Sequence, residues 1–280
     1  MNKSRGFTLI ELLVVIAIIA LLMAILMPSL QRVRRQAKTV SCQAQLRQWG
    51  VIFSAYTSDC DGYFMQGWTG TAEYPWAQGR WIWINALRPY YSDPKMRLCP
   101  MAAKFILDES GNDTGARPPY AAYGIINRGD EYAYINGDYT SYMINWWVNR
   151  CPPGFSVTWG EERQFWKNTD VRGAGNIPVF GDGSFWLARP NHTDSPPDYD
   201  GQWNWADAPG TMGMKRIMVN RHDGFTNWLF MDWSIRKMGL KQAYTYKWSR
   251  TFDTGGIWTA AGGLRSSDWP PWMRKFKEYY

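Results

Sequence analysis

The chain has 280 residues, of which 45% are hydrophobic and 16% aromatic, and its formal net charge is +7. This length excludes a single small domain and a string of independent domains, and it accommodates one large core or a core with long insertions. The positive charge is too mild for this length to predict a nucleic-acid partner.

The first predicted element is an apolar helix. From Phe7 to Met27 there are 21 residues, all apolar except Thr8 and Glu11. A helix of this length is about 30 Å long, which matches the hydrocarbon core of a bilayer. A cleaved secretory signal would have a shorter apolar run that ends in a small-residue cleavage site, and none follows here. The segment is therefore predicted to remain as a membrane anchor.

Glu11 is the costly residue in this run, since an ionised carboxylate in hydrocarbon is unfavourable by several kcal/mol without a partner. Cleavage after Gly6 would make Phe7 the new N-terminus and supply a free amine. Within one helix this amine is awkwardly placed for Glu11, whereas a neighbouring subunit shifted along the helix axis could pair with it. The charge thus predicts side-by-side packing of these helices.

Residues 3–16, KSRGFTLIELLVVI, closely resemble the cleavage and methylation signal of type IV prepilins and type II secretion pseudopilins. The resemblance implies that a prepilin peptidase removes leader 1–6, cuts between Gly6 and Phe7, and methylates the new amine of Phe7. It makes Glu11 the assembly glutamate. The implied partners are the peptidase, other pilin or pseudopilin subunits, and an inner-membrane assembly platform.

The same resemblance implies a transmembrane and assembly helix over 7–28, inserted once in the cytoplasmic membrane with the body on the periplasmic or extracellular side. Pro28 removes a helix hydrogen bond. The resemblance makes it a hinge that responds to assembly; a simple kink at the membrane exit is the alternative. Over 29–57, apolar residues at three- and four-residue steps predict an amphipathic continuation of the helix.

A basic cluster follows the apolar run, formed by Arg32, Arg34, Arg35 and Lys38. Such a cluster could meet lipid phosphates or nucleic acid. We favour a solvated helix face near the membrane. Asp59-Cys60-Asp61-Gly62 then predicts the end of the helix and a turn. An Asp-x-Asp-Gly sequence could bind calcium, but the other ligands of an EF-hand loop are missing, so no metal is predicted.

The remaining chain, 58–280, is predicted as a pilin-like globular body, which makes the fold class α+β with a long N-terminal helix on an antiparallel sheet. The strand candidates are 81–84, 139–148, 177–180, 214–219 and 227–238. Stretches 107–119, 149–163 and 189–212 are predicted as long surface insertions. Residues 240–250 suit a helix or a strand equally, and 270–280 could form a short helix that starts at proline.

The four cysteines, Cys42, Cys60, Cys99 and Cys151, are far apart in the sequence. No CxxC pair occurs and no histidine is near them in sequence, so a zinc site is not predicted. Outside the cytoplasm one or two disulfides become plausible, and three complete pairings stay open.

The C-terminal half also resembles a subgroup of large pseudopilin-like proteins found in planctomycetes and related bacteria. The resemblance is carried by LCP at 98–100, SYMIN at 141–145, IPVFGDG at 177–183, and by His222 followed ten residues later by Asp232. The subgroup usually has glycine after that aspartate, where this chain has Trp233. This departure puts the local turn geometry in question.

Catalytic motifs such as GxSxG, a P-loop or HExxH are missing, so neither enzyme activity nor a cofactor is predicted. His222 and Asp232 could form an acid–base pair. We favour a structural role in which His222 hydrogen-bonds across a hairpin and fixes a turn.

The chain contains 18 tryptophans, several of them in or near the predicted insertions: Trp146, Trp147, Trp203, Trp205, Trp258, Trp269 and Trp272. Such rings could stack on sugars or pack the insertions against the body. The main prediction is a structural subunit of a type II secretion pseudopilus or type IV pilus-like filament. The alternative is a filament subunit that binds polysaccharide through exposed tryptophans.

Overall fold

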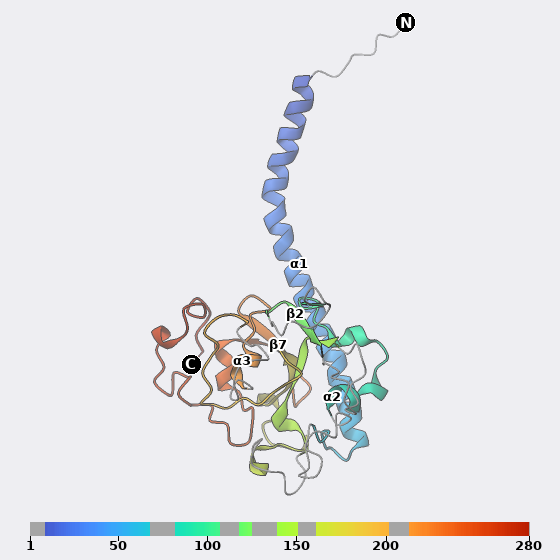
Figure 1. Cartoon of the computed structure of the whole chain (residues 1–280), viewed down its shortest axis with the longest axis vertical. Coiled ribbons are helices and arrows are strands. Elements are labelled where there is room, and N and C mark those ends of the chain that lie inside the picture. The colour runs from blue at the N-terminus through green and yellow to red at the C-terminus, as the bar shows by residue number, and fades with distance from the viewer. Residues whose placement is uncertain are drawn as a thin grey trace.

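The computed structural model describes residues 9–67, 82–106, 118–124, 139–150, 161–201 and 213–279. Figure 1 shows one long helix, α1 (Leu9–Asp59), that projects from a mixed α+β body and whose C-terminal half lies against that body. This arrangement confirms the predicted fold class.

Helix α1 has 51 residues and continues through Pro28 without a break. The hinge at Pro28 therefore stays a prediction. The helix ends where the sequence indicated, at Asp59, and the chain then turns through Asp61 (φ 53°) and Gly62 (φ 81°). Left-handed backbone of this kind is favourable for glycine and is tolerated by aspartate. The Asp59 carboxylate accepts a hydrogen bond of 2.7 Å from the Tyr90 hydroxyl.

The two halves of α1 have different surroundings. The side chains from Leu9 to Met27 are exposed, for example Leu9 at 80% and Ile25 at 67%. The C-terminal half buries one stripe of residues at helical spacing: Cys42, Leu46, Trp49, Gly50, Ile52, Phe53 and Thr57. This stripe packs on strands β7 (Phe225–Phe230) and β8 (Ile235–Gly239), so the body holds the helix by its second half.

The main sheet has five strands in the order β6-β4-β5-β7-β8. Their bounds are β4 (Tyr142–Asn145), β5 (Pro178–Asp182), β6 (Leu187–Ala188), β7 (Phe225–Phe230) and β8 (Ile235–Gly239). The central pairs are antiparallel, and the short edge strand β6 runs parallel to β4. Strands β4 and β5 are buried along their whole length, which explains their near-continuous apolar sequences.

A smaller sheet has the order β1-β2-β3, with β1 (Lys104–Phe105), β2 (Ala121–Gly124) and β3 (Tyr139–Thr140). The body also contains two short α-helices, α2 (Trp83–Ala86) and α3 (Met214–Ile217). The 3-10 turns are η2 (Arg88–Tyr90), η3 (Pro94–Arg97), η4 (Trp146–Val148), η6 (Glu162–Gln164), η7 (Ala174–Asn176), η8 (Lys241–Thr245) and η9 (Ser266–Asp268).

Three strand predictions agree with the sheet: 139–148 contains β3 and β4, 177–180 lies in β5, and 227–238 is the β7–β8 hairpin. Two are wrong. Residues 214–219 begin with the helical turn α3, because Met214, Ile217 and Met218 bury one helical face.

The other wrong strand prediction is 81–84, whose described part enters α2; Trp81 lies outside the described residues. The ambiguous stretch 240–250 contains the 3-10 turn η8. The tail from Pro270 to Tyr279 forms turns instead of the expected short helix. Most of the predicted insertions 107–119 and 149–163 and the second part of 189–212 lie outside the described residues, while 189–201 is described and contains turns and bends without a helix or strand.

Trp49 is the centre of an aromatic cluster that joins α1 to the sheet. Its ring lies 5.4 Å from that of Trp83, 5.0 Å from Tyr91 and 5.2 Å from Phe180 on β5. Its indole N–H donates a 2.8 Å hydrogen bond to the Met96 carbonyl. Both the apolar body and the polar end of this side chain are therefore satisfied inside the core.

We therefore predict that Trp49→Ala lowers the free energy of unfolding by about 3–5 kcal/mol, because it removes a large buried ring and leaves a cavity. Urea denaturation of the full-length protein, followed by circular dichroism, measures the loss. Val51→Ala on the exposed side of the same helix is the control, and we expect a change within about 0.5 kcal/mol. Equal effects of the two variants would contradict the assignment of Trp49 to the core.

Candidate functional site

Among the described residues, one helix is long and apolar enough by length and composition to cross a membrane, and it is α1. Glu11 lies in its first turn. Gly6 and Phe7 precede the described residues, so their predicted cleavage and methylation stay predictions.

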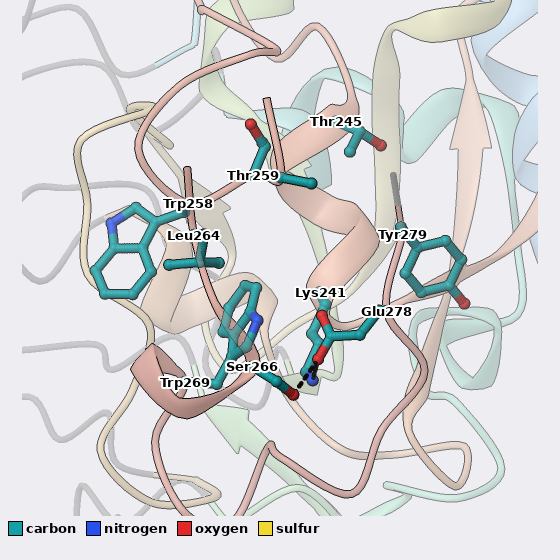
Figure 2. Close-up of a pocket in the computed structure, with 10 residues that line it drawn as sticks. Lys241, Thr245, Trp258, Thr259, Leu264, Ser266, Trp269, Glu278 and Tyr279 are labelled. Atoms are coloured by element: carbon teal, nitrogen blue, oxygen red, sulfur yellow. Dashed lines mark hydrogen bonds and ion pairs between the residues drawn. The ribbon is translucent and has the colours of Figure 1, made fainter. Parts of the chain in front are cut away.

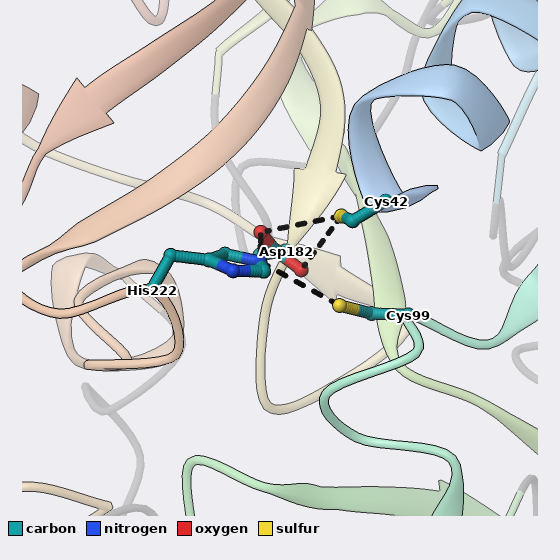
Figure 3. Close-up of side chains that lie close together, drawn as sticks. All are labelled: Cys42, Cys99, Asp182 and His222. Carbon is teal, nitrogen blue, oxygen red and sulfur yellow. Dashed lines mark hydrogen bonds and ion pairs between the residues drawn. The ribbon is translucent and has the colours of Figure 1, made fainter. Parts of the chain in front are cut away.

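A second group of side chains forms a buried cluster where α1 meets the sheet. We define the buried cluster as Cys42, Cys99, Asp182 and His222, whose sulfur, oxygen and nitrogen atoms all lie within 4.8 Å of one another (Figure 3). Cys42 comes from α1, Cys99 follows η3, Asp182 ends β5, and His222 precedes β7. The fold thus brings together four residues that are far apart in sequence.

Asp182 is the centre of this cluster. One carboxylate oxygen lies 3.0 Å from the Arg221 guanidinium, and the other lies 3.1 Å from Nε2 of His222. The second oxygen also accepts a 2.7 Å hydrogen bond from the backbone N–H of Asn227. Burial alone would raise the pKa of Asp182, but these partners hold it well below its ordinary value.

Arg221 is fully buried, and its donors are satisfied mainly by backbone carbonyls. It donates to the carbonyls of Pro119 at 2.7 Å, Ser141 at 2.6 Å and Gly183 at 2.9 Å, in addition to Asp182. A buried guanidinium is tolerated when its hydrogen bonds are made and a carboxylate balances its charge. Arg221 therefore links the loop before β7 to the ends of β4 and β5.

His222 uses both ring nitrogens. Nδ1 lies 3.0 Å from the Thr39 hydroxyl on α1, and Nε2 faces Asp182 and, at 3.6 Å, the sulfur of Cys99. Burial alone would lower the pKa of His222, but the carboxylate of Asp182 outweighs burial and raises it to about 9. Burial raises the pKa of the Cys99 thiol well above its ordinary value.

The expected association of His222 with Asp232 is not what the structure shows. The two residues lie beyond opposite ends of β7. Asp232 is in the β7–β8 turn, where it accepts hydrogen bonds from Ser234 and pairs with Arg236 at 3.3 Å. The carboxylate partner of His222 is instead Asp182, so the histidine ties separate elements together and does not bridge the hairpin.

Trp233 has a left-handed backbone with φ of 62°. This conformation normally favours glycine, and Trp233 adopts it here although it has a side chain. The tryptophan ring lies 6.4 Å from that of Phe64.

Cys42, Cys60 and Cys99 are free thiols in the structure, and Cys151 lies outside the described residues. The spacing of the cysteines in the sequence predicted no zinc site, but the fold places Cys42 and Cys99 beside His222 and Asp182. Asp182 belongs to the IPVFGDG segment that the sequence analysis singled out, but no local sequence pattern indicated that its partners are His222, Cys42 and Cys99. Disulfide formation stays a prediction.

Five of the seven tryptophans named as sugar-stacking candidates lie in the described residues, and three of these five are buried. Trp146 and Trp147 are buried, and the indole N–H of Trp147 donates to the Pro190 carbonyl at 2.9 Å. Trp269 is also buried, and Trp272 donates to the Pro197 carbonyl at 2.8 Å. These contacts favour the packing interpretation for the described tryptophans; Trp203 and Trp205 lie outside the described residues.

Trp258 and Trp269 line a pocket of about 120 Å³, together with the ion pair of Lys241 and Glu278 (Figure 2). Ligand pockets for drug-sized molecules typically have about 300–1,000 Å³. The volume of this pocket is below that range, so the pocket is too small to enclose an oligosaccharide of drug size. Polysaccharide binding at an open surface stays a prediction.

Comparison with known proteins agrees with the N-terminal features. Residues 1–27 match the family described as the prokaryotic N-terminal methylation motif. Over 63 residues the chain is 43% identical to the type IV wide pilus major component PilA4 of Thermus thermophilus. That match covers 22% of this chain and 48% of PilA4, so the chain spans about half the length of this relative. No solved structure matches the chain.

The buried ion pair gives a direct test of the cluster. We predict that Arg221→Met lowers the free energy of unfolding by about 3–5 kcal/mol, because it leaves the Asp182 carboxylate buried without its cation. Arg236→Met is the matched control: it breaks the partly exposed pair with Asp232, and we expect a loss of at most about 1 kcal/mol. Urea denaturation compares the two variants. An Arg221→Met protein as stable as the control would contradict the assigned role of the pair.

Proposed function

We propose that this chain is a pilin-like structural subunit that is processed at Gly6 and assembles through its N-terminal helix into a filament. The observation that carries the proposal is the division of α1. Its second half is packed on the sheet, while its apolar first half projects from the body and is exposed (Figure 1). The methylation motif over the same residues supports this proposal.

The exposed apolar segment needs a non-aqueous environment, because each Å² of apolar surface in water costs about 25 cal/mol. A membrane provides one before assembly, and the helices of neighbouring subunits provide another within a filament. The protein would be inserted once in the cytoplasmic membrane, with Gly6 on the side where a prepilin peptidase acts and the body on the other side.

Glu11 gives the proposed assembly its register. Removal of residues 1–6 would place a methylated amine on Phe7, and the Glu11 carboxylate of a neighbouring subunit is the opposite charge at similar depth. In a low-dielectric surrounding such a pair is strongly favoured over two separate charges. The amine of Phe7 and the Glu11 carboxylate of the neighbouring subunit come into contact only when the two helices are shifted along their axes by a particular distance.

Both a type II secretion pseudopilus and a type IV pilus-like filament are consistent with these features. The similar protein PilA4 is a major component of a type IV wide pilus. The sequence similarity covers 22% of this chain, and the similar protein is a pilus component, not a pseudopilin. We therefore place the type IV pilus-like filament ahead of the pseudopilus as the working proposal.

Substitution at the cleavage position tests processing. In cells with an active prepilin peptidase, Gly6→Asp should leave the full-length precursor, since the bulky charged side chain occupies the position before the scissile bond. Intact mass spectrometry of the membrane fraction distinguishes the precursor from a chain that starts at Phe7 and carries one added methyl group. Glu161→Gln, far away in the body, should be processed normally. Cleavage of Gly6→Asp at the same bond would contradict the proposal.

Substitution of Glu11 tests assembly separately from processing. We expect Glu11→Gln, which keeps the shape and removes the charge, and Glu11→Val to be cleaved normally but recovered mainly as unassembled protein in the membrane. Shear fractionation with quantitative immunoblotting measures the assembled share. Normal assembly of Glu11→Gln would rule out charge pairing as the recruiting interaction, even if processing at Gly6 holds.

A further inference from the structure

We propose that the buried cluster of Cys42, Cys99, Asp182 and His222 is a binding site for one divalent transition-metal ion of the zinc type. Two sulfur atoms, one imidazole nitrogen and one carboxylate oxygen form a ligand set that Zn²⁺ accepts. All four residues are buried, as is usual for a closed structural site.

The spacing of the ligand atoms fits tetrahedral coordination. Bonds of about 2.0–2.1 Å to nitrogen or oxygen and about 2.3 Å to sulfur set separations of about 3.3–3.8 Å between the ligands around Zn²⁺. In the cluster, Nε2 of His222 lies 3.1 Å from Asp182 and 3.6 Å from the sulfur of Cys99. The sulfur of Cys42 lies 3.9 Å from both oxygens of Asp182. The remaining pairs lie within 4.8 Å, so the most widely separated ligands would move closer by up to about 1 Å on binding the ion.

Hydrogen bonds outside the cluster orient the histidine. The Thr39 hydroxyl donates its proton to the Arg35 carbonyl at 3.0 Å, so its oxygen is left to accept from Nδ1 of His222. This arrangement places the proton on Nδ1 and turns Nε2 toward the other ligands. Metal-binding histidines normally have such a partner on the second nitrogen.

The other ligands are supported in the same way. Arg221 contacts one oxygen of Asp182, and the second oxygen faces His222. The Tyr142 hydroxyl lies 3.3 Å from the sulfur of Cys42 and 3.0 Å from Oε1 of Gln45, and it can donate its single proton to either acceptor. A hydrogen bond to a metal-bound thiolate is favourable, because it spreads the negative charge.

The charges of the site also balance. Two thiolates and the Asp182 carboxylate carry three negative charges, and these are neutralised by a divalent ion together with the Arg221 guanidinium. This balance matters because an uncompensated charge in a buried site is strongly unfavourable. A monovalent ion would leave the site negative.

The ion would join the projecting helix to the body. Cys42 belongs to α1, Asp182 to β5, and the remaining ligands belong to the segments that follow η3 and precede β7. Since none of these segments forms the site alone, metal binding would be coupled to docking of α1 on the sheet. The ion would thereby stabilise the part of the fold that supports the apolar segment.

The test uses the full-length chain in detergent, reduced and treated with a chelator, then titrated with Zn²⁺ alone and separately with Co²⁺. We expect one ion per chain by native mass spectrometry, a higher melting temperature with Zn²⁺, and thiolate-to-cobalt charge-transfer absorption with tetrahedral d–d bands. Cys42→Ser and Cys99→Ser should weaken these signals strongly. The matched control Cys60→Ser should preserve them, because Cys60 lies outside the cluster.

A variant that leaves all four ligands in place is needed in case a ligand variant fails to fold. Thr39→Val removes the partner of His222 without touching a ligand, and we expect a 10–100-fold weaker Zn²⁺ affinity. Absence of binding by the folded wild-type chain would overturn the proposal. So would a Cys42–Cys99 disulfide in the native protein, seen as a two-hydrogen mass loss without reductant, or full cobalt spectra in the Cys42→Ser, Cys99→Ser double variant.

Discussion

Everything in this molecule depends on one continuous helix that has two different surroundings. The second half of α1 is buried against β7 and β8 through a single stripe of side chains. From Leu9 to Met27 the helix is apolar on every side apart from Glu11, and this segment projects beyond the body. A helix that is apolar all round is stable only inside a membrane or among other apolar helices. The need to cover this segment therefore governs where the chain resides and what it contacts.

The body is built to hold that helix firmly. Trp49 inserts from α1 into an aromatic cluster that includes Phe180 on β5. Elsewhere along the same helix, Thr39 contacts His222, and Asp182 connects the histidine to Arg221. These polar contacts are buried and well satisfied, so they specify one seating of the helix on the sheet. Apolar packing contributes most of the free energy that holds α1 on the sheet, and the buried ion pairs fix the position of α1 along the strands.

The features that could be predicted from sequence are the local ones. The length of α1, its end near Asp59, strand β5 and the β7–β8 hairpin follow from hydrophobic period and turn residues. The short helix α2 could not be distinguished from a strand, because a run of four apolar residues fits both periods. In α3 the positions of Met214, Ile217 and Met218 fit a helical face, but a single turn is too short for that period to stand out from the sequence.

The buried cluster could not be predicted because its residues are distant in sequence. Asp182 lies 40 positions before His222 and 140 after Cys42, and only the strand order brings them together. Sequence spacing favoured Asp232 as the partner of His222, yet β7 separates the two. The tryptophans illustrate the same limit, since composition alone does not tell a buried ring from an exposed one.

The measurement that tests the central claim most directly is the N-terminal sequence and state of assembly of the protein from its native cells. Edman sequencing of the sheared filament fraction should begin at an N-methylated Phe7, and the same species should sediment as a high-molecular-weight polymer. A chain that begins at Met1 while the peptidase is active, or that occurs only as single subunits in the membrane, would contradict the account.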